Sequence, residues 1–587
     1  MQLLSHFVLV GVIALFAPLK LSAQEANDSA KPKQAETMQK AQEALPLVIV
    51  EARALKLPEN RAAVLAQAFA LLWPHDEKAA RELIPEITGN LKQMFSKVDE
   101  NQQQNRFYQV RKSTREQAVN QIAKVDLELA LEMLRATRPP LNAESAIKDL
   151  QQSDLNVEQN LANQIAAHNP DVALKLAEQS LEKGFSYSLR PLLTTIQKKS
   201  PEKATSLLDK IYKKLQTEDV LLSNEARFFA SSFLVEEFRA HKKELPKGHE
   251  LQGIKLREPL LGKEDLKKWT DTFVRPYLSL PNRIDAMREK SNVLGSLQMV
   301  SPFLDFVSPE LMQPVNMMLS KIRPKLSDHE KERFDAEHLR TQGKVDELVA
   351  MAEKLPKERR DGFLWNAIMA AIDYLGDPDL ATKIIDNHVT SDEKKKQYRD
   401  FVAWINSYLL AEQGKIDEVI ASLAHITRDA EKARTLARIA ESNVKSRPAK
   451  IQLLERAVQY LGDSIDTGES FSVHCYIIGI YAQVDSERAF ALLEPQIDPM
   501  NRVWEAAANY CTFDGGFVCL ARKGELLMSP NFNSSRFIFD VVNAIRGVGK
   551  VNFARAYELA QQIKSPEIRS QALIAMIESN LVRSEEK

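Results

Sequence analysis

The chain has 587 residues, and its 79 basic and 80 acidic side chains leave a formal net charge of -1. This balance lacks the basic excess that is typical of nucleic-acid-binding proteins and of proteins drawn to anionic membranes. Only 19 residues are glycine, and because tight hairpin turns favour glycine, the composition disfavours a β-rich fold. We therefore expect a helical protein whose partners do not include nucleic acid.

The N-terminus carries an apolar run at residues 7–19, followed by Leu21-Ser22-Ala23. The run is shorter than the roughly 20 residues that a membrane-spanning helix needs. It predicts a signal peptide over residues 1–23, cleaved near Ala23, and an exported protein that is periplasmic or extracellular. An uncleaved anchor is the alternative, because only His6 and the amino terminus supply positive charge before the run.

Residues 24–40 are rich in Ala, Lys, Gln and Glu, a composition typical of a flexible leader. No later stretch of the sequence is both uncharged and close to membrane-spanning length. We therefore expect no transmembrane segment in the mature chain.

A short helix-start pattern then recurs. At 169–173, 200–204 and 377–381 an Asn, Ser or Asp precedes a proline and an acidic residue, with an alanine one turn later. The first side chain can cap free N–H groups, proline has no N–H to leave unpaired, and the acidic residue faces the positive end of the helix dipole. Looser copies start at Asp126, Asp485 and Asn552. The repetition predicts an all-α superhelical array of antiparallel helix pairs, an α-solenoid, with a division into two halves as a further expectation.

The periodicity divides the chain into segments. Residues 41–240 read as an N-terminal helical-repeat region, in which Ala173 and Ala204 mark equivalent points 31 residues apart. Residues 241–267 are charged and contain several Pro and Gly residues, which indicates a linker or excursion. Residues 268–327 predict a helical junction interrupted by Pro302, Pro309 and Pro314. Residues 328–587 read as a C-terminal helical-repeat region.

Residues 342–347, Gln-Gly-Lys-Val-Asp-Glu, return at 413–418 as Gln-Gly-Lys-Ile-Asp-Glu. These turns resemble those of tetratricopeptide repeats, which commonly read Gln-Gly-x-x-x-Glu-Ala. Aligned on Gly414, however, Val419 occupies the usual alanine position, and Asn406 and Ser407 stand where a Leu-Gly pair is usual. The resemblance covers two turns and implies a generic tetratricopeptide-like helical-repeat class, without a specific family or its partners.

The cysteines are Cys475, Cys511 and Cys519. In an oxidising compartment Cys511 and Cys519 are the candidate disulfide, because a Gly-Gly sequence between them eases closure of the loop. The alternative is that all three are small buried apolar residues. Under either reading the apolar neighbours of Cys475 predict a buried thiol.

Three motifs bear on catalysis, metals and cofactors. The sequence at His329 imitates a zinc-protease helix but lacks its second histidine, and residues 547–551 imitate a phosphate loop without its first glycine and its Ser or Thr. Glu469-Ser470-Phe471 resembles the catalytic Glu-Ser-x-Phe of lytic transglycosylases, but the Gly-Leu-Met-Gln segment of that family is missing. We predict no catalytic, metal or cofactor residues from these patterns.

Aromatic residues leave two readings open. Phe228, Phe229, Phe233 and Phe238 lie mostly on one helical face, and such a stripe belongs to the core more often than to a recognition surface. The helical positions of Trp73, Trp365, Trp404 and Trp504 favour packing anchors between helices over ligand contacts.

The sequence thus favours an exported helical-repeat scaffold that binds a protein or peptide partner and has no catalysis of its own. The alternative is an all-helical envelope enzyme that acts on cell-wall glycan with carboxylates dispersed along the chain. Two facing carboxylates in a deep cleft would favour the enzyme, and an open groove would favour the scaffold.

Overall fold

The computed structural model describes residues 17–96, 106–140, 144–244, 257–286, 290–462, 467–514, 521–528 and 536–581. Within these ranges the chain is all-α, apart from one short hairpin of strands β1 (Ala521–Arg522) and β2 (Glu525–Leu526). The predicted all-α array is confirmed. None of the helices in these ranges is both long and apolar enough to cross a membrane.

The chain packs as two compact units, of which the first combines its two ends, residues 1–140 and 450–587. The helices of the N-terminal part are α2 (Ala17–Ala54), α3 (Pro58–Leu72), α4 (Glu77–Glu82), α5 (Ile84–Phe95), α6 (Arg106–Ala123) and α7 (Leu127–Ala136). The C-terminal part holds α26 (Gly468–Val484), α27 (Ser486–Leu493), the 3-10 helix η8 (Glu494–Gln496), α28 (Ile497–Asp514), α29 (Arg536–Gly549), α30 (Phe553–Gln561) and α31 (Pro566–Leu581). Helix α25 (Arg447–Leu461) spans the boundary between the units.

The second unit comprises residues 141–449. It begins with α8 (Glu144–Ala166), α9 (Pro170–Leu181), α10 (Leu189–Lys199), α11 (Pro201–Thr217), α12 (Asn224–Lys242) and α14 (Lys263–Val274). Short elements follow: η2 (Arg275–Asn282), η3 (Ile284–Ala286), α15 (Lys290–Val300), η4 (Ser301–Phe303), α16 (Leu304–Val307), η5 (Pro309–Leu311), α17 (Met312–Ile322) and η6 (Arg323–Lys325). The unit ends with α18 (Asp328–Thr341), α19 (Val345–Glu353), α20 (Lys357–Asp373), α21 (Pro378–His388), α22 (Asp392–Glu412), α23 (Ile416–Ser422), η7 (Leu423–His425) and α24 (Asp429–Ser442).

The helix-start pattern produces the expected caps. Asn169 accepts a hydrogen bond from the N–H of Val172 at 3.2 Å, and Asp377 accepts one from the N–H of Leu380 at 2.8 Å. Ser200 precedes α11, but its side chain makes no cap hydrogen bond, and its hydroxyl donates to the carboxylate of Glu202. The alanines one turn into these helices are buried, as close helix packing requires: Ala173, Ala204 and Ala381.

The repeated Gln-Gly turns end one helix and begin the next, as predicted. Gly343 and Gly414 have φ values of 66° and 74°, the left-handed conformation that glycine adopts without strain. After α18 the N–H of Lys344 donates to the carbonyl of Leu339 at 3.0 Å, and Lys415 donates to Leu410 at the same distance after α22. Both turns therefore satisfy helix-end carbonyls in the manner of a Schellman motif.

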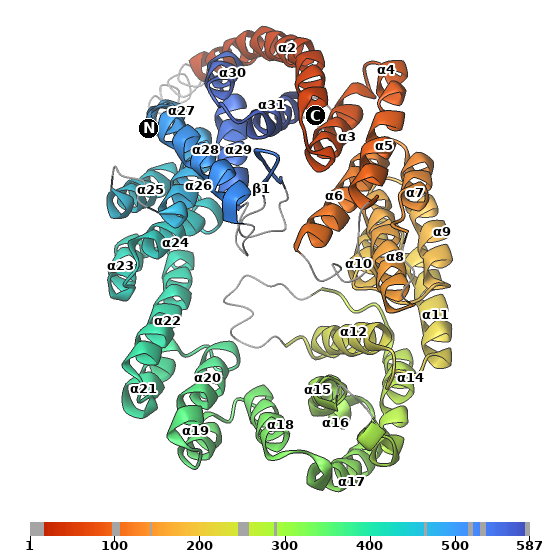
Figure 1. The fold of residues 1–587 in the computed structure, drawn as a ribbon. Helices are drawn as coiled ribbons and strands as arrows, with labels where there is room; N and C mark the ends of the chain where they lie inside the picture. Colours follow the sequence, from red (N-terminus) through yellow and green to blue (C-terminus); the bar gives the residue numbers. More distant parts are fainter. Residues whose placement is uncertain are drawn as a thin grey trace, which may run out of the picture. The chain divides into compact units, whose positions relative to one another are not determined.

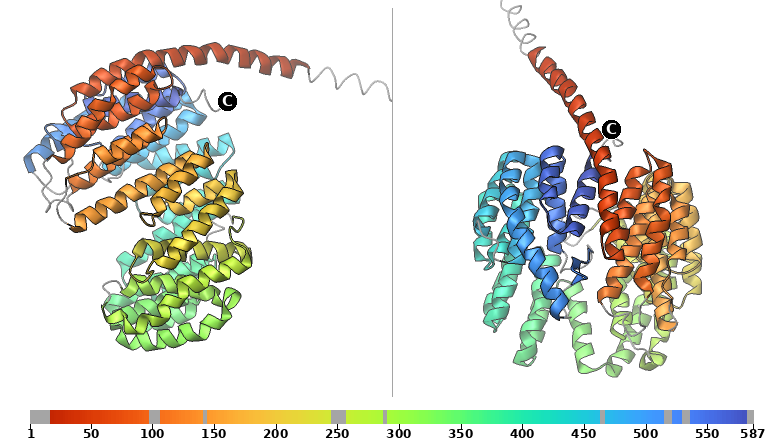
Figure 2. Two further views of the ribbon diagram at one scale, coloured as in Figure 1. Left: turned by 90° about the vertical axis from the view of Figure 1, so that its right-hand side faces the viewer. Right: turned by 45° about the horizontal axis from the view of Figure 1, so that its top comes forward.

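The second unit is a two-layer helix array. One layer runs through α8, α10, α12, α15, α18 and α20, each in contact with the next, and α9, α11 and α14 form a row behind its first part. Figures 1 and 2 show α8 to α11 side by side as the start of this array. Short turns between successive helices make neighbours antiparallel. In the first layer, Phe228 of α12 and Met299 of α15 are exposed apolar side chains.

The first unit closes the two ends of the chain on each other. Helices α2 and α3 pack against α31, and α29 packs against both α26 and α31. The glycines of the phosphate-loop-like sequence allow this packing. A Cβ on Gly549 would stand 2.3 Å from the Cγ of Met576 in α31, and one on Gly547 would stand 3.3 Å from the Cα of Gly479 in α26. That sequence is therefore a helix-contact motif.

The hairpin at 521–526 joins these two ends. Its turn uses Lys523 and Gly524, with φ values of 57° and 76°, as a two-residue hairpin turn requires. The buried carboxylate of Glu525 accepts hydrogen bonds from the backbone N–H groups of Lys56 and Leu57. On the other side, the N–H of Leu526 donates to Glu567 of α31 at 2.9 Å.

The division of the chain into six sequence segments remains a prediction. Helix α2 begins at Ala17 and thus continues through the expected leader at 24–40. In the expected excursion at 241–267, α12 ends at Lys242 and α14 begins at Lys263. The expected junction at 268–327 consists mostly of short helices, with Pro302 and Pro309 in the first turns of η4 and η5.

Candidate binding groove

The second unit contains a groove on its first helix layer, made of two adjoining cavities. The larger, of about 650 Å³, lies between α12, α15 and α18, and the smaller, of about 400 Å³, lies between α12, η4, α18 and the end of α20. The two share Met299, Glu337 and Arg340 as lining residues. We call their combined lining the α12–α18 groove. Volumes of this size fit a ligand or several peptide side chains.

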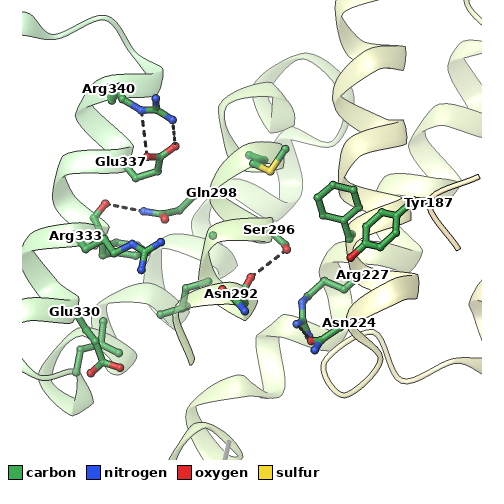
Figure 3. Close-up of a pocket in the computed structure, with 16 residues that line it drawn as sticks. Tyr187, Asn224, Arg227, Asn292, Ser296, Gln298, Glu330, Arg333, Glu337 and Arg340 are labelled. Carbon is green, nitrogen blue, oxygen red and sulfur yellow. Dashed lines mark hydrogen bonds and ion pairs between the residues drawn. The ribbon is translucent and has the colours of Figure 1, made fainter. Parts of the chain in front are cut away.

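The three helices bring polar and apolar side chains to the larger cavity, as Figure 3 shows. Arg227 and Asn224 of α12 and nearby Tyr187 lie on one side. Glu330, Arg333, Glu337 and Arg340 follow one another along α18 on the opposite side, with Asn292, Ser296 and Gln298 of α15 between. The Gln298 side chain donates to the carbonyl of Phe334 at 2.7 Å and so ties α15 to α18.

Apolar side chains in the groove remain open to solvent. Tyr187 is 59% exposed and Phe228 46% exposed, and their rings meet edge to face with centroids 4.9 Å apart. Met299, 38% exposed, lies where the two cavities join. Solvent contact of large apolar groups gathered in a groove is unfavourable, so this surface would gain stability from being covered.

The charged groups of the groove are mostly basic. Five basic residues (Arg227, Arg239, Lys242, Arg333 and Arg340) and three acidic ones (Glu244, Glu330 and Glu337) line it. The whole chain, by contrast, carries a net charge of -1. The basic excess is therefore local to the groove, and it favours an acidic ligand.

Two of the three acidic side chains of the groove, those of Glu330 and Glu337, already make hydrogen bonds within the protein. Glu337 accepts two hydrogen bonds from Arg340, at 3.2 and 2.8 Å. Burial is the largest single influence on the pKa of Arg340 and lowers it, but the hydrogen bonds to Glu337 together with the negative charges of Glu337 and Asp373 and the nearby Tyr374 raise that pKa overall. Glu330 bonds Ser327 in a capping box, and these hydrogen bonds lower the pKa of its carboxyl. Neither carboxylate is placed as a general acid would be.

Two of the five basic side chains, those of Arg333 and Lys242, are less engaged by contacts within the protein. Arg333 is exposed and makes no ion pair with any residue that the structure describes. The ammonium of Lys242 lies 5.8 Å from the ring centre of Phe303 and 5.6 Å from that of Phe306, both favourable cation–π distances. Burial lowers the pKa of Arg239, against the opposing influence of Tyr374 and Glu236.

The aromatic stripe predicted from the sequence divides between core and groove. Phe229, Phe233 and Phe238 are buried, as the core reading predicted, whereas Phe228 lines the groove. Trp504 is buried and Trp73 packs on Phe69, so both act as packing anchors. Trp365 and Trp404 pack against the core of the second unit and also line a separate cavity, described below.

The candidate chemical motifs do not assemble an active site. Glu469 lies in the first turn of α26, where Thr467 and Ser470 form a capping box, so its sequence marks a helix start. His329 is exposed in the first turn of α18. Among the described residues no cluster of His, Cys, Asp and Glu could hold a metal ion. Loss of hydration raises the pKa of the carboxyls of Glu412 and Glu567, but neither lines a described cavity.

Cys475 is a free, buried thiol, as predicted, and burial raises its pKa well above the ordinary value. The candidate disulfide of Cys511 and Cys519 lies outside the side chains that the structure describes. The groove residues Tyr187, Arg239 and Arg333 carry no local sequence signal. Among the groove residues, Phe228 stood out in the sequence as a member of the aromatic stripe, and Pro302 as an interruption of the predicted helical junction.

Comparison with known proteins adds little. No family model and no curated protein matches the chain. Among solved structures it is similar to one described as a "circular tandem repeat protein with novel repeat topology and enhanced subunit contact surfaces", at 11% identity and a TM-score of 0.16, over 92% of this chain and 98% of that one. A likeness at this score carries no argument, so the helical-repeat assignment rests on the chain's own helices, caps and turns.

Proposed function

We propose that the protein is an exported scaffold of the tetratricopeptide-like helical-repeat class that binds a protein or peptide partner in the α12–α18 groove. The observation that carries the proposal is the lining of the groove. Tyr, Phe, Met and Arg, the residue types enriched in protein interfaces, meet there on one exposed helix layer. Helical repeats expose such surfaces because each helix pair covers only one face of its neighbour.

The chemistry of the groove indicates which peptides fit. Tyr187, Phe228 and Met299 offer an apolar site for an aromatic or aliphatic anchor side chain. Arg333 and Lys242 lie in the larger and the smaller cavity, respectively, and can pair with acidic residues on either side of that anchor. An acidic segment with an apolar anchor is therefore the expected ligand.

Selection from a random peptide library on the full mature chain tests this proposal. We expect enriched peptides to combine acidic residues with an apolar anchor, and Phe228→Ala to weaken their binding about tenfold, since an interface anchor is worth more than 1 kcal/mol. Leu222→Ala is the matched control, because Leu222 is 68% exposed in the same unit but outside the groove.

A charge reversal provides the second arm. Arg333→Glu should abolish binding of the acidic peptides, whereas Lys321→Glu, at an exposed position on α17 outside the groove, should not. Selection of peptides without acidic residues, or binding unaffected by both groove variants, would refute the assignment.

Export is the second element of the proposal, supported by the apolar run at 7–19 and by Leu21-Ser22-Ala23. Processing near Ala23 would yield a mature chain that begins at or near Gln24. N-terminal sequencing of the native protein tests this directly. An intact Met1 on protein recovered from the membrane fraction would contradict it.

A further inference from the structure

A second cavity in the same unit differs in character from the groove. It has a volume of about 800 Å³ and is lined by Trp365 of α20, by Phe401, Trp404 and several polar residues of α22, and by residues at and before α24. We call it the α22 cavity. Trp365 and Tyr374, which lines the groove, are nine residues apart along α20 and therefore point to opposite sides of that helix.

Aromatic rings form a continuous row along the α22 cavity. Trp365 contacts Phe401 at a centroid distance of 4.8 Å, and Phe401 contacts Trp404 at 5.7 Å. The ring planes of Trp365 and Phe401 are inclined by 63°, and those of Phe401 and Trp404 by 42°. The rings therefore do not cover each other's faces as they would in parallel stacking. All three rings also pack on the core, which holds them in place while part of each lines the cavity.

Trp404 is fixed further by its neighbour. Its ring contacts Tyr408 edge to face, with the ring centroids 5.4 Å apart. A ring held by packing on several sides loses little conformational entropy when a ligand covers it. The row is thus a preorganised apolar platform.

The remaining lining is polar and has no net charge. Lys396, Arg428 and Arg438 are balanced by Glu393, Asp400 and Glu431. All except the ammonium of Lys396 are planar carboxylate or guanidinium groups, which can bond two adjacent hydroxyls at once.

Asp400 has an unsatisfied acceptor. Its Oδ2 accepts from the hydroxyl of Thr427 at 3.2 Å, while its Oδ1 is buried and has no hydrogen-bond partner among the described residues. A buried acceptor of this kind calls for a donor.

From this combination we propose that the α22 cavity binds a neutral oligosaccharide. The apolar C–H faces of sugar rings pack on aromatic rings, and their hydroxyls both donate to carboxylates and accept from guanidinium and amide groups. The balanced charge gives no advantage to an ionic ligand. A proline-rich peptide would also pack on the aromatic row, but it offers few donors for the carboxylates of Glu393 and Asp400.

Calorimetric titration of the full mature chain with chitohexaose, cellohexaose and maltohexaose tests the proposal, with decaproline as the competing probe. At least one saccharide should bind with a Kd of about 1 mM or tighter. Trp404→Ala should weaken that binding at least about tenfold and Trp404→Phe by less than about threefold, because phenylalanine keeps an aromatic face. Trp73→Ala, which removes a half-buried tryptophan of the other unit, should leave it unchanged.

Because Trp404 also packs on the core, circular dichroism must show that its variants fold. Gln397→Ala provides a second readout that does not touch the core, since Gln397 is exposed and lines the cavity, and it should also weaken binding. The proposal is overturned if none of the three saccharides binds at about 10 mM, if decaproline binds in their place, or if the Trp404 and Gln397 variants bind as tightly as the natural chain. The test is independent of the peptide groove, which involves neither residue.

Discussion

Replacing Glu525 with alanine should loosen the contact that joins the two ends of the chain. The carboxylate is 1% exposed and accepts the N–H groups of Lys56 and Leu57, the latter at 3.0 Å. The Asn60 side chain adds a longer bond at 3.4 Å but also bonds the carbonyl of Leu526 at 2.9 Å, so it keeps a partner in the variant.

The expected cost follows from the groups left unpaired. The Leu57 N–H is buried, and a buried donor without a partner costs about 1–3 kcal/mol. The Lys56 N–H lies nearer the surface, where water can replace the carboxylate, so its loss adds about 1 kcal/mol. The free energy of unfolding should therefore fall by about 2–4 kcal/mol, which for a unit of this size lowers the melting temperature by roughly 5–15 °C.

Differential scanning calorimetry measures the overall effect, and hydrogen exchange locates it at residues 56–60 and 521–528. Glu525→Gln separates the acceptor from the charge. Glutamine keeps one acceptor oxygen and removes a buried charge that has only neutral donors as partners, but its NH2 group replaces the oxygen that accepted one of the two N–H groups. Its cost should therefore be smaller than that of alanine, at about 1–2 kcal/mol. Glu77→Ala, which removes an exposed pair with Arg81, should cost less than about 0.5 kcal/mol. An alanine variant at 525 no less stable than this control would refute the reasoning.

Three further outcomes are expected. Gly549→Ala should lower the free energy of unfolding by about 1–3 kcal/mol, because the new Cβ would overlap Met576. Gly89→Ala should raise it by about 0.5–1 kcal/mol, because Gly89 is exposed on α5 and a Cβ there would meet nothing within 4 Å. Equal effects of the two substitutions in urea denaturation would contradict the packing argument. Burial raises the pKa of the Glu567 carboxyl, so the folded chain binds this proton more tightly than the unfolded chain does. The resulting contribution to stability is complete below the pKa of the unfolded chain and is lost as the pH rises through the pKa of the folded chain. Glu567→Gln should therefore stabilise the protein at pH 7 more than at pH 4, and a pH-independent difference would exclude this linkage. Cys475 should react with iodoacetamide only after unfolding, and rapid labelling of the native chain, followed by peptide mass spectrometry, would show that it is not buried as the structure places it.

The sequence predicted those features of the fold that depend on neighbouring residues. Asn169 and Asp377 cap their helices because the acceptor, the proline and the N–H groups all lie within four positions. Ser200 shows the limit of the pattern. It occupies the same position before a proline and an acidic residue, yet its hydroxyl is oriented to donate to the carboxylate of Glu202 and accepts no helix N–H.

The groove could not be predicted in the same way. Its residues come from five separate segments, near Tyr187, Phe228, Met299, Arg333 and Tyr374, and only the stacking of α12, α15, α18 and α20 brings them together. Within α12 the helical period does give a reason for the division of the aromatic stripe. Phe229 and Phe233 are one turn apart and face the core, whereas Phe228 lies about 100° away from Phe229 and reaches solvent.

The contacts between the two ends of the chain could not be predicted from the sequence either, because Leu57 and Glu525 are separated by 468 positions. The glycines at 547 and 549 are a different case, because their pattern is visible in the sequence but does not arise from a phosphate loop. A phosphate loop and a close helix crossing both need residues without a side chain, the first to approach an anion and the second to approach Met576 and Gly479. Only the position of these glycines inside α29 and near its end separates the two explanations.

Helix α20 shows how one repeat element can serve two binding surfaces. Tyr374 at its end lies beside the basic side chains of the α12–α18 groove, while Trp365 on its opposite side lies in the charge-balanced α22 cavity. A helix in an array has neighbours before and behind it, so each of its two flanks can line a separate site without a change in its core face. The basic excess of the groove comes from Arg227, Arg239 and Lys242 of α12, because the two arginines and two glutamates that α18 contributes balance each other. In the α22 cavity the charges from α22 and from the residues at and before α24 balance as well. Repeats that share one packing pattern can therefore carry different ligand preferences along the same chain.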